Sequence, residues 1–149
     1  MDNMMIPPHS SEAEQAVIGA VMINPSCWDD VSFLSPADFY RADHRAIWSR
    51  FSNPDMRDFV AMSTVMDSES ISLLGEIAKN TPGIANAARY ASIVRDRALL
   101  RRFIAECNQS ISEAFKSDVS PLNLIADHVR KSDDLLSCTT NTSGLRHVF

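Results

Sequence analysis

Few residues of the types found in catalytic sites are spaced so that their side chains could act together on one substrate. Two pairs of adjacent carboxylates, Asp29–Asp30 and Asp133–Asp134, come nearest to an acid–base pair. Neighbouring residues of a helix point about 100° apart, whereas a general acid and a general base must converge on one substrate. We therefore expect these carboxylates to be solvated or to cap helices.

The histidines and cysteines do not predict a catalytic or metal-binding group either. Cys27, Cys107 and Cys138 lack the CxxC or Cys–His spacing of zinc sites, and their odd number does not indicate a disulfide framework. His44 lies in an aromatic cluster, where we expect a hydrogen-bonded packing residue rather than a base or a ligand. His128 has no partner evident in the sequence. We expect no cofactor and no metal.

Sequence motifs for nucleotide binding and hydrolysis are absent. The chain has only 4 glycines and contains no G-x-x-x-x-G-K-[ST], G-x-G-x-x-G, H-E-x-x-H or G-x-S-x-G pattern. No apolar run approaches the ~20 residues that span a bilayer, and residues 1–9 do not resemble a signal peptide. We predict a non-enzymatic, cytoplasmic protein with no membrane contact.

The composition indicates one compact helical domain. The 149 residues are 45% hydrophobic and 22% charged, as in ordinary globular proteins. Helix-forming and helix-capping residues dominate, and runs of β-branched residues are scarce. We predict an all-α fold, a globular helical head followed by an antiparallel helical hairpin.

Pro, Ser, Asn and Asp mark the expected helix starts of the head, which we place at residues 1–84. The first helix follows Pro7–Pro8, with Ser10 or Ser11 as N-cap; only Ser11 would form a capping box, with Glu14. Further caps are expected at Asn24, Asp58 and Ser68, and Asn80–Gly83 is the strongest turn signal. An aromatic-rich segment from Phe39 to Phe51, which we expect to be one helix, supplies most of the core of the head. The expected core residues are Trp28, Phe39, Tyr40, His44, Ile47 and Trp48.

The hairpin is expected over residues 85–136, with the start of a linker at 137–149. A helix from about residue 86 to 116 carries apolar residues at heptad spacing, and Ser120–Pro121 starts the second helix. One partner helix would not cover all of this apolar surface, which then packs on the head or on another chain. We expect the oligomer interface to comprise Leu100, Phe103, Ile104, Cys107 and Ile111.

The chain carries a net charge of −5, and its charged residues are distributed unevenly along the sequence. Residues 1–88 have 5 Lys and Arg against 12 Asp and Glu, whereas residues 89–131 have 8 against 5. The basic helix contributes possible polar partner contacts at Arg95, Arg97, Arg101 and Arg102. The alternatives are a solvated face with local pairs such as Arg102–Glu106, and a small nucleic-acid binder. The acidic total and the lack of interleaved aromatic residues disfavour the binder.

Four segments, in order, resemble the N-terminal domain of bacterial DnaB-type replicative DNA helicases over about residues 7–105. The segments are Pro7–Ser10 with Glu12–Gln15 and Val17–Gly19, Trp28–Val31, Asp38–Tyr40 with His44, Ile47 and Trp48, and Lys79–Pro82 with Ala85–Asn86, Tyr90–Ala91 and Ile93–Arg95. The resemblance implies an all-helical head and hairpin. It also implies dimers formed through the hairpin, and trimers of dimers as a collar on a hexameric motor.

The resemblance also implies partners. The family's domain docks the helicase-binding domain of primase, and a helicase loader or a regulator is a further expected partner; sequence-specific DNA binding is not expected. The chain departs from the family between Phe51 and Glu76, where it is shorter and lacks a Gly-Gly pair, and no ATPase motor lies in these residues. The leading hypothesis is therefore a non-catalytic collar domain. The alternative is a free-standing regulator that binds a full-length helicase collar.

Overall fold

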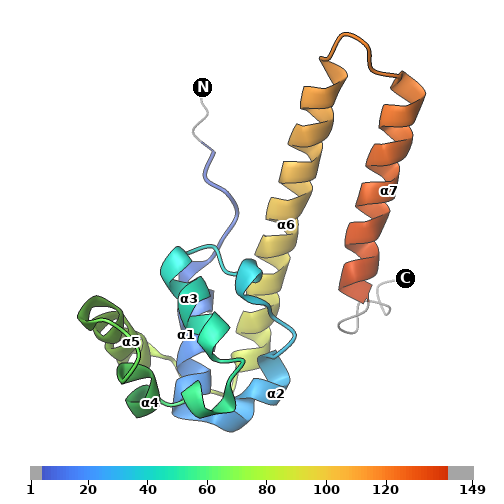
Figure 1. Cartoon of the computed structure of the whole chain (residues 1–149). Helices are drawn as coiled ribbons and strands as arrows, with labels where there is room; N and C mark the ends of the chain where they lie inside the picture. Colours follow the sequence, from blue (N-terminus) through green and yellow to red (C-terminus); the bar gives the residue numbers. More distant parts are fainter. Residues whose placement is uncertain (1–4, 141–149) are drawn as a thin grey trace. The chain divides into compact units, whose positions relative to one another are not determined.

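The computed structural model describes residues 5–140, and every regular element within this range is a helix (Figure 1). The α-helices are α1 (Ser11–Ile23), α2 (Trp28–Val31), α3 (Ala42–Arg50), α4 (Phe59–Ser63), α5 (Ser68–Asn80), α6 (Ala87–Ala114) and α7 (Pro121–Thr140). Short 3₁₀ turns lie at Pro25–Cys27, Pro36–Asp38 and Pro54–Met56. The predicted all-α fold is confirmed.

The chain divides into two compact units: the first unit is Met1–Ala98 and the second unit is Leu99–Phe149. Their boundary falls inside α6, not at the turn near residue 84 where the sequence placed it. The early turns of α6 belong to the first unit because Ala87, Ala91 and Val94 are buried in its core. α7 continues to Thr140, so residues 137–140 are helix rather than the expected linker; residues 141–149 lie outside the described range.

Most helix starts lie where the sequence signals placed them. The side chain of Asn24 accepts a hydrogen bond from the Ser26 amide, and that of Asp58 accepts one from the Ala61 amide. One expected cap was wrong: Asp67, not Ser68, caps α5, by accepting a hydrogen bond from the Ser70 amide. A carboxylate at this position also suits the positive end of the helix dipole.

Aromatic rings form the centre of the first unit's core. Trp48 is buried with its ring 4.8 Å from Phe39 and 5.4 Å from Phe51, and its Nε1 donates to the Leu34 carbonyl at 3.0 Å. The indole nitrogen is therefore satisfied although it is buried. Of the six expected core residues, Phe39, His44, Ile47 and Trp48 are buried, and Trp28 and Tyr40 are partly exposed.

A buried glutamate of α1, Glu14, bonds the backbone just before α3. Glu14 was expected to close a capping box with Ser11, but Ser10 is the N-cap of α1 and Glu14 points into the core. Its Oε2 accepts from the Tyr40 amide at 2.7 Å, and its Oε1 accepts from the Arg41 amide at 3.5 Å. The backbone at Phe39 and Tyr40 is consequently not helical, and α3 starts only at Ala42. The single helix expected through Phe39 and Tyr40 was wrong.

Close packing of the chain after α5 depends on Gly19. A Cβ atom at Gly19 would lie 1.6 Å from Oγ1 of Thr81, so only glycine lets the end of α5 approach α1 this closely. The hydroxyl of Thr81 donates to the Ile77 carbonyl at 2.6 Å. Gly83 follows with a φ of +125°, a conformation that L side chains rarely adopt.

Candidate functional site

The second unit exposes most of its apolar side chains. α6 beyond residue 98 and α7 run antiparallel (Figure 1), yet no residue from 99 to 138 is buried. Phe115 is 86% exposed and Leu122 80%. The other large exposed apolar residues of this unit are Leu100, Phe103, Ile104, Ile111, Ile125, Val129 and Leu136. Exposed apolar surface on this scale is typical of an interaction site.

Two grooves lie between α6 and α7. The base groove has a volume of about 330 Å³ and is lined by Leu99, Leu100, Phe103, Ser132, Leu135 and Leu136. The tip groove, of about 380 Å³, is nearer the loop that joins the two helices and is lined by Cys107, Ser110, Ile111, Ala114, Leu124, Ile125 and His128. Both linings are mainly apolar, which suits them to apolar side chains of a partner.

The five residues expected at an oligomer interface all lie on the second unit. Leu100 and Phe103 line the base groove, and Cys107 and Ile111 line the tip groove. Ile104 is 43% exposed and lines neither groove. Their role in self-association stays a prediction.

A polar cluster that the sequence did not indicate ties α6 to α7. Oε2 of Glu106 lies 2.6 Å from Nδ1 of His128, and Ser132 donates its hydroxyl to Oε1 of Glu106 at 3.2 Å. The Ser110 hydroxyl is also 2.7 Å from Nδ1 of His128. The sequence suggests only the local pair Arg102–Glu106, because spacing along one helix is visible in a sequence whereas a contact between helices is not.

The four arginines expected as polar partner contacts are all half-buried. Arg95 is engaged inside the first unit, where it donates to the Phe33 carbonyl at 3.4 Å and lies 5.6 Å from the centre of the Phe33 ring. Arg97 also belongs to the first unit, whereas Arg101 and Arg102 belong to the second. The role of these arginines as partner contacts stays a prediction.

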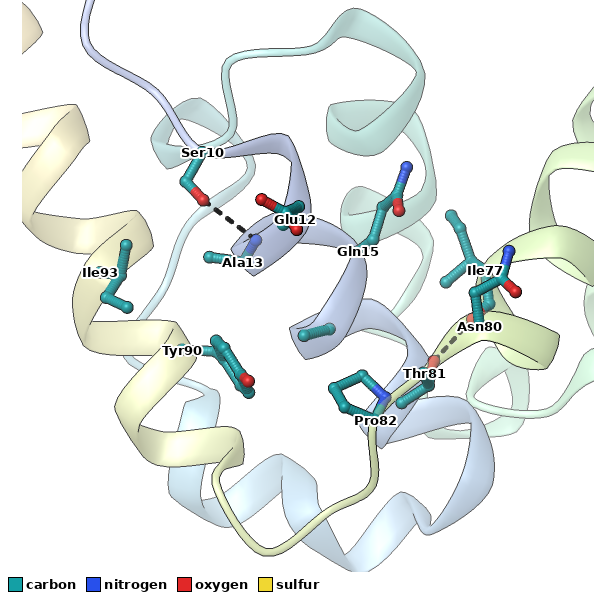
Figure 2. A pocket seen from close by; sticks show the side chains of 11 residues that line it. Ser10, Glu12, Ala13, Gln15, Ile77, Asn80, Thr81, Pro82, Tyr90 and Ile93 are labelled. Atoms are coloured by element: carbon teal, nitrogen blue, oxygen red, sulfur yellow. Dashed lines mark hydrogen bonds between the residues drawn. The ribbon is translucent and has the colours of Figure 1, made fainter.

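The first unit has a pocket of its own, of about 490 Å³ (Figure 2). It lies between the start of α1, the end of α5 and the first turns of α6, with Tyr90 and Ile93 on one wall and Asn80–Pro82 on the other. Two hydroxyls at its edge are already bonded: Ser10 accepts from the Ala13 amide, and Thr81 donates to the Ile77 carbonyl. The pocket thus offers a mixed polar and apolar surface.

Within residues 5–140, no three His, Cys, Asp or Glu side chains gather where they could hold a metal ion. No helix in the same range is long and apolar enough to cross a membrane.

Known proteins are similar to this chain in sequence and in fold. The family model of the DnaB-like helicase N terminal domain matches residues 6–96. Replicative DNA helicase DnaB of Pasteurella multocida is 32% identical over 99% of this chain, and replicative DNA helicase DnaC of Bacillus subtilis is 28% identical over 98%. The chain covers 35% of the length of each of these two relatives.

A solved structure agrees with the family match. The crystal structure of the N-terminal domain of DnaB helicase from Mycobacterium tuberculosis superposes with a TM-score of 0.73 at 25% identity, over 87% of this chain and 99% of that one. The family model spans more than half of the present chain. The chain therefore belongs to the family of DnaB-like helicase N-terminal domains.

Proposed function

We propose that this domain associates with a second copy of itself through the second unit, as part of the collar of a replicative DNA helicase. The observation that carries the proposal is the absence of any buried residue from 99 to 138, although both helices present apolar side chains there. A helix pair that buries so little of its own apolar surface gains stability when a partner covers that surface.

Charge on the second unit is compatible with a second copy as the partner. Residues 99–140 carry 5 Lys and Arg against 6 Asp and Glu, so two copies would repel each other little. Several of these charges are already paired beside one another on a helix, as in Lys131 with Asp127 at 3.1 Å and Lys116 with Glu113 at 2.9 Å. In a two-fold symmetric dimer every contact occurs twice, so a modest apolar face suffices.

Light scattering over a dilution series tests this proposal. The wild-type chain is expected to give a dimer that dissociates on dilution. Replacing one residue in each groove, Leu100→Ala with Ile111→Ala, is expected to weaken the dimer by roughly 30- to 1000-fold, since buried interface side chains cost about 1–2 kcal/mol each or more when truncated. A wild-type chain that is monomeric at every concentration would refute the proposal.

The matched control is Val60→Ala. Val60 is 71% exposed and apolar like the interface residues, but it lies on α4 in the first unit. Its truncation is expected to leave the dissociation constant unchanged. Equal weakening by Val60→Ala would show that the hairpin grooves are not the specific contact.

We also propose that the domain recruits primase, through its helicase-binding domain, and that dimers assemble further into a trimer of dimers. Membership of the DnaB-like family supports both statements. Calorimetric titration of the 149-residue chain with that primase domain is expected to show saturable binding. No heat at high concentration would reject recruitment and would leave the proposal of self-association standing.

A further inference from the structure

The cluster of Glu106, His128 and Ser132 interrupts the apolar face of the second unit between its two grooves. Along α6, Glu106 follows the residues that line the base groove and precedes those that line the tip groove. On α7, Ser132 lines the base groove and His128 lines the tip groove. One carboxylate is thus bonded to one residue of each groove.

The carboxylate of Glu106 is well shielded from water. Its side chain is only 9% exposed, although no residue from 99 to 138 counts as buried as a whole. Removing a carboxylate from water is costly unless hydrogen bonds compensate, and here His128 and Ser132 both provide them. Leucine at this position would avoid the cost, so stability alone does not explain a glutamate.

A polar contact within an apolar face can fix the register of two packed helices, because hydrogen bonds are directional. Apolar contacts are non-directional, so they discriminate only weakly between neighbouring registers of two helices. The Glu106 hydrogen bonds, at 2.6 Å to His128 and 3.2 Å to Ser132, are satisfied in one register only. A single polar residue in an apolar seam specifies register and oligomeric state in coiled coils in the same way.

We propose that Glu106 is a positioning residue that sets the register of α7 on α6 and thereby the relative placement of the two grooves that receive the second copy. This inference rests on the proposed self-association. Glu106 acts through His128 and Ser132, not through the partner, so its removal changes how the copies fit together rather than how much apolar surface they bury.

The decisive variant is Glu106→Leu in the full 149-residue chain. Leucine keeps the helix and adds apolar surface, so the affinity of self-association is expected to stay the same or to rise. The defined assembly is expected to be lost: native mass spectrometry should show several oligomers in place of one dimer. Amide NMR spectra should show multiplied or broadened peaks for residues 99–138, where the wild type gives one peak per residue.

Two further variants make the test specific. Glu106→Gln keeps an acceptor for His128 and gains a donor for Ser132, so it should retain one species and one set of peaks. The matched control is Glu113→Leu, the same change one heptad further along α6. Glu113 bonds Gln109 and Lys116, which are its neighbours along the chain, rather than a residue of α7. This variant should therefore behave as the wild type.

The outcomes separate this inference from the proposal on which it rests. A monomeric wild type would refute self-association itself. A dimeric wild type together with a uniform Glu106→Leu dimer would overturn only the positioning role of Glu106. If Glu106→Leu does not fold by circular dichroism, His128→Leu removes the same contact from the α7 side and is judged by the same two measurements.

Discussion

Nδ1 of His44 lies 2.7 Å from Oε1 of Glu14, and both side chains are essentially withdrawn from solvent. The contact joins α3 to α1 across the core of the first unit. The same carboxylate also accepts the Tyr40 amide, so it bonds both a buried imidazole and the backbone just before α3. His44 is buried and hydrogen-bonded, its role as a packing residue alone stays a prediction, and its partner could not have been named in advance.

Glu14→Ala should destabilise the chain by about 3–5 kcal/mol, because breaking a buried pair leaves the other partner unpaired in the core. Urea denaturation followed by circular dichroism measures the loss. The control is Glu12→Ala, an exposed residue in the same first turn of α1, which should cost no more than about 1 kcal/mol through the helix dipole. Equal losses for the two variants would contradict the structural role of Glu14.

Two glycines offer an opposed pair of substitutions. Gly19→Ala should destabilise the chain by about 1–3 kcal/mol, the usual cost of overpacking, because the new Cβ would meet Oγ1 of Thr81 at 1.6 Å. Gly75 lies inside α5 and has no atom within 4 Å of a built Cβ, so Gly75→Ala should stabilise by about 0.5–1 kcal/mol. Thermal unfolding of both variants checks the prediction, which fails if both shift the melting temperature in the same direction.

Arg57→Lys should cost about 1 kcal/mol despite conserving the charge. The guanidinium lies 4.2 Å from the centre of the Trp28 ring, and its Nε donates to the Phe51 carbonyl at 2.7 Å. Lysine reproduces neither the planar stacking nor this hydrogen bond. Urea denaturation and tryptophan fluorescence should both report the change, whereas Arg50→Lys, at an exposed position, should leave both unaltered.

Asp43 should give the chain an acid-dependent component of stability. Partial burial raises the pKa of Asp43, but the hydrogen bond from Arg41 and the neighbouring His44 outweigh it and bring the pKa below its ordinary value of 3.8. A lowered pKa in the folded state stabilises the protein above the ordinary value, and this stabilisation is lost as the pH falls through the folded-state pKa. The side chain is 38% exposed, so the contribution should stay below about 1 kcal/mol.

Asp43→Asn tests this pH dependence. The difference in unfolding free energy between wild type and variant should be largest near neutral pH and should shrink as the pH falls below the ordinary aspartate value. Denaturant titrations at a series of pH values measure it. A difference that does not change with pH would show that the charge of Asp43 does not contribute.

Local features of the fold could be predicted because their causes lie within a few residues. Asn24 and Asp58 cap helices by bonding amides two or three positions along the chain, and α5 ends at Asn80 because Thr81, the residue before Pro82, favours an extended backbone. The heptad spacing of α6 likewise placed apolar residues on the surface that the second unit exposes. Each of these follows from the geometry of one helix or one turn.

The tertiary structure decided what distant residues do to one another. Glu14 suited a capping box with Ser11 by spacing, but a carboxylate bonds whichever donors the fold brings to it, and here those lie 26 and 30 positions away. Glu106 suited a local pair with Arg102, yet it bonds Ser132, 26 positions away on another helix. Most helix ends could be predicted from the sequence because they depend on short-range chemistry, and the family because its motifs are short and local. The partners of buried charges could not be predicted, because they depend on which helix faces meet in the folded chain.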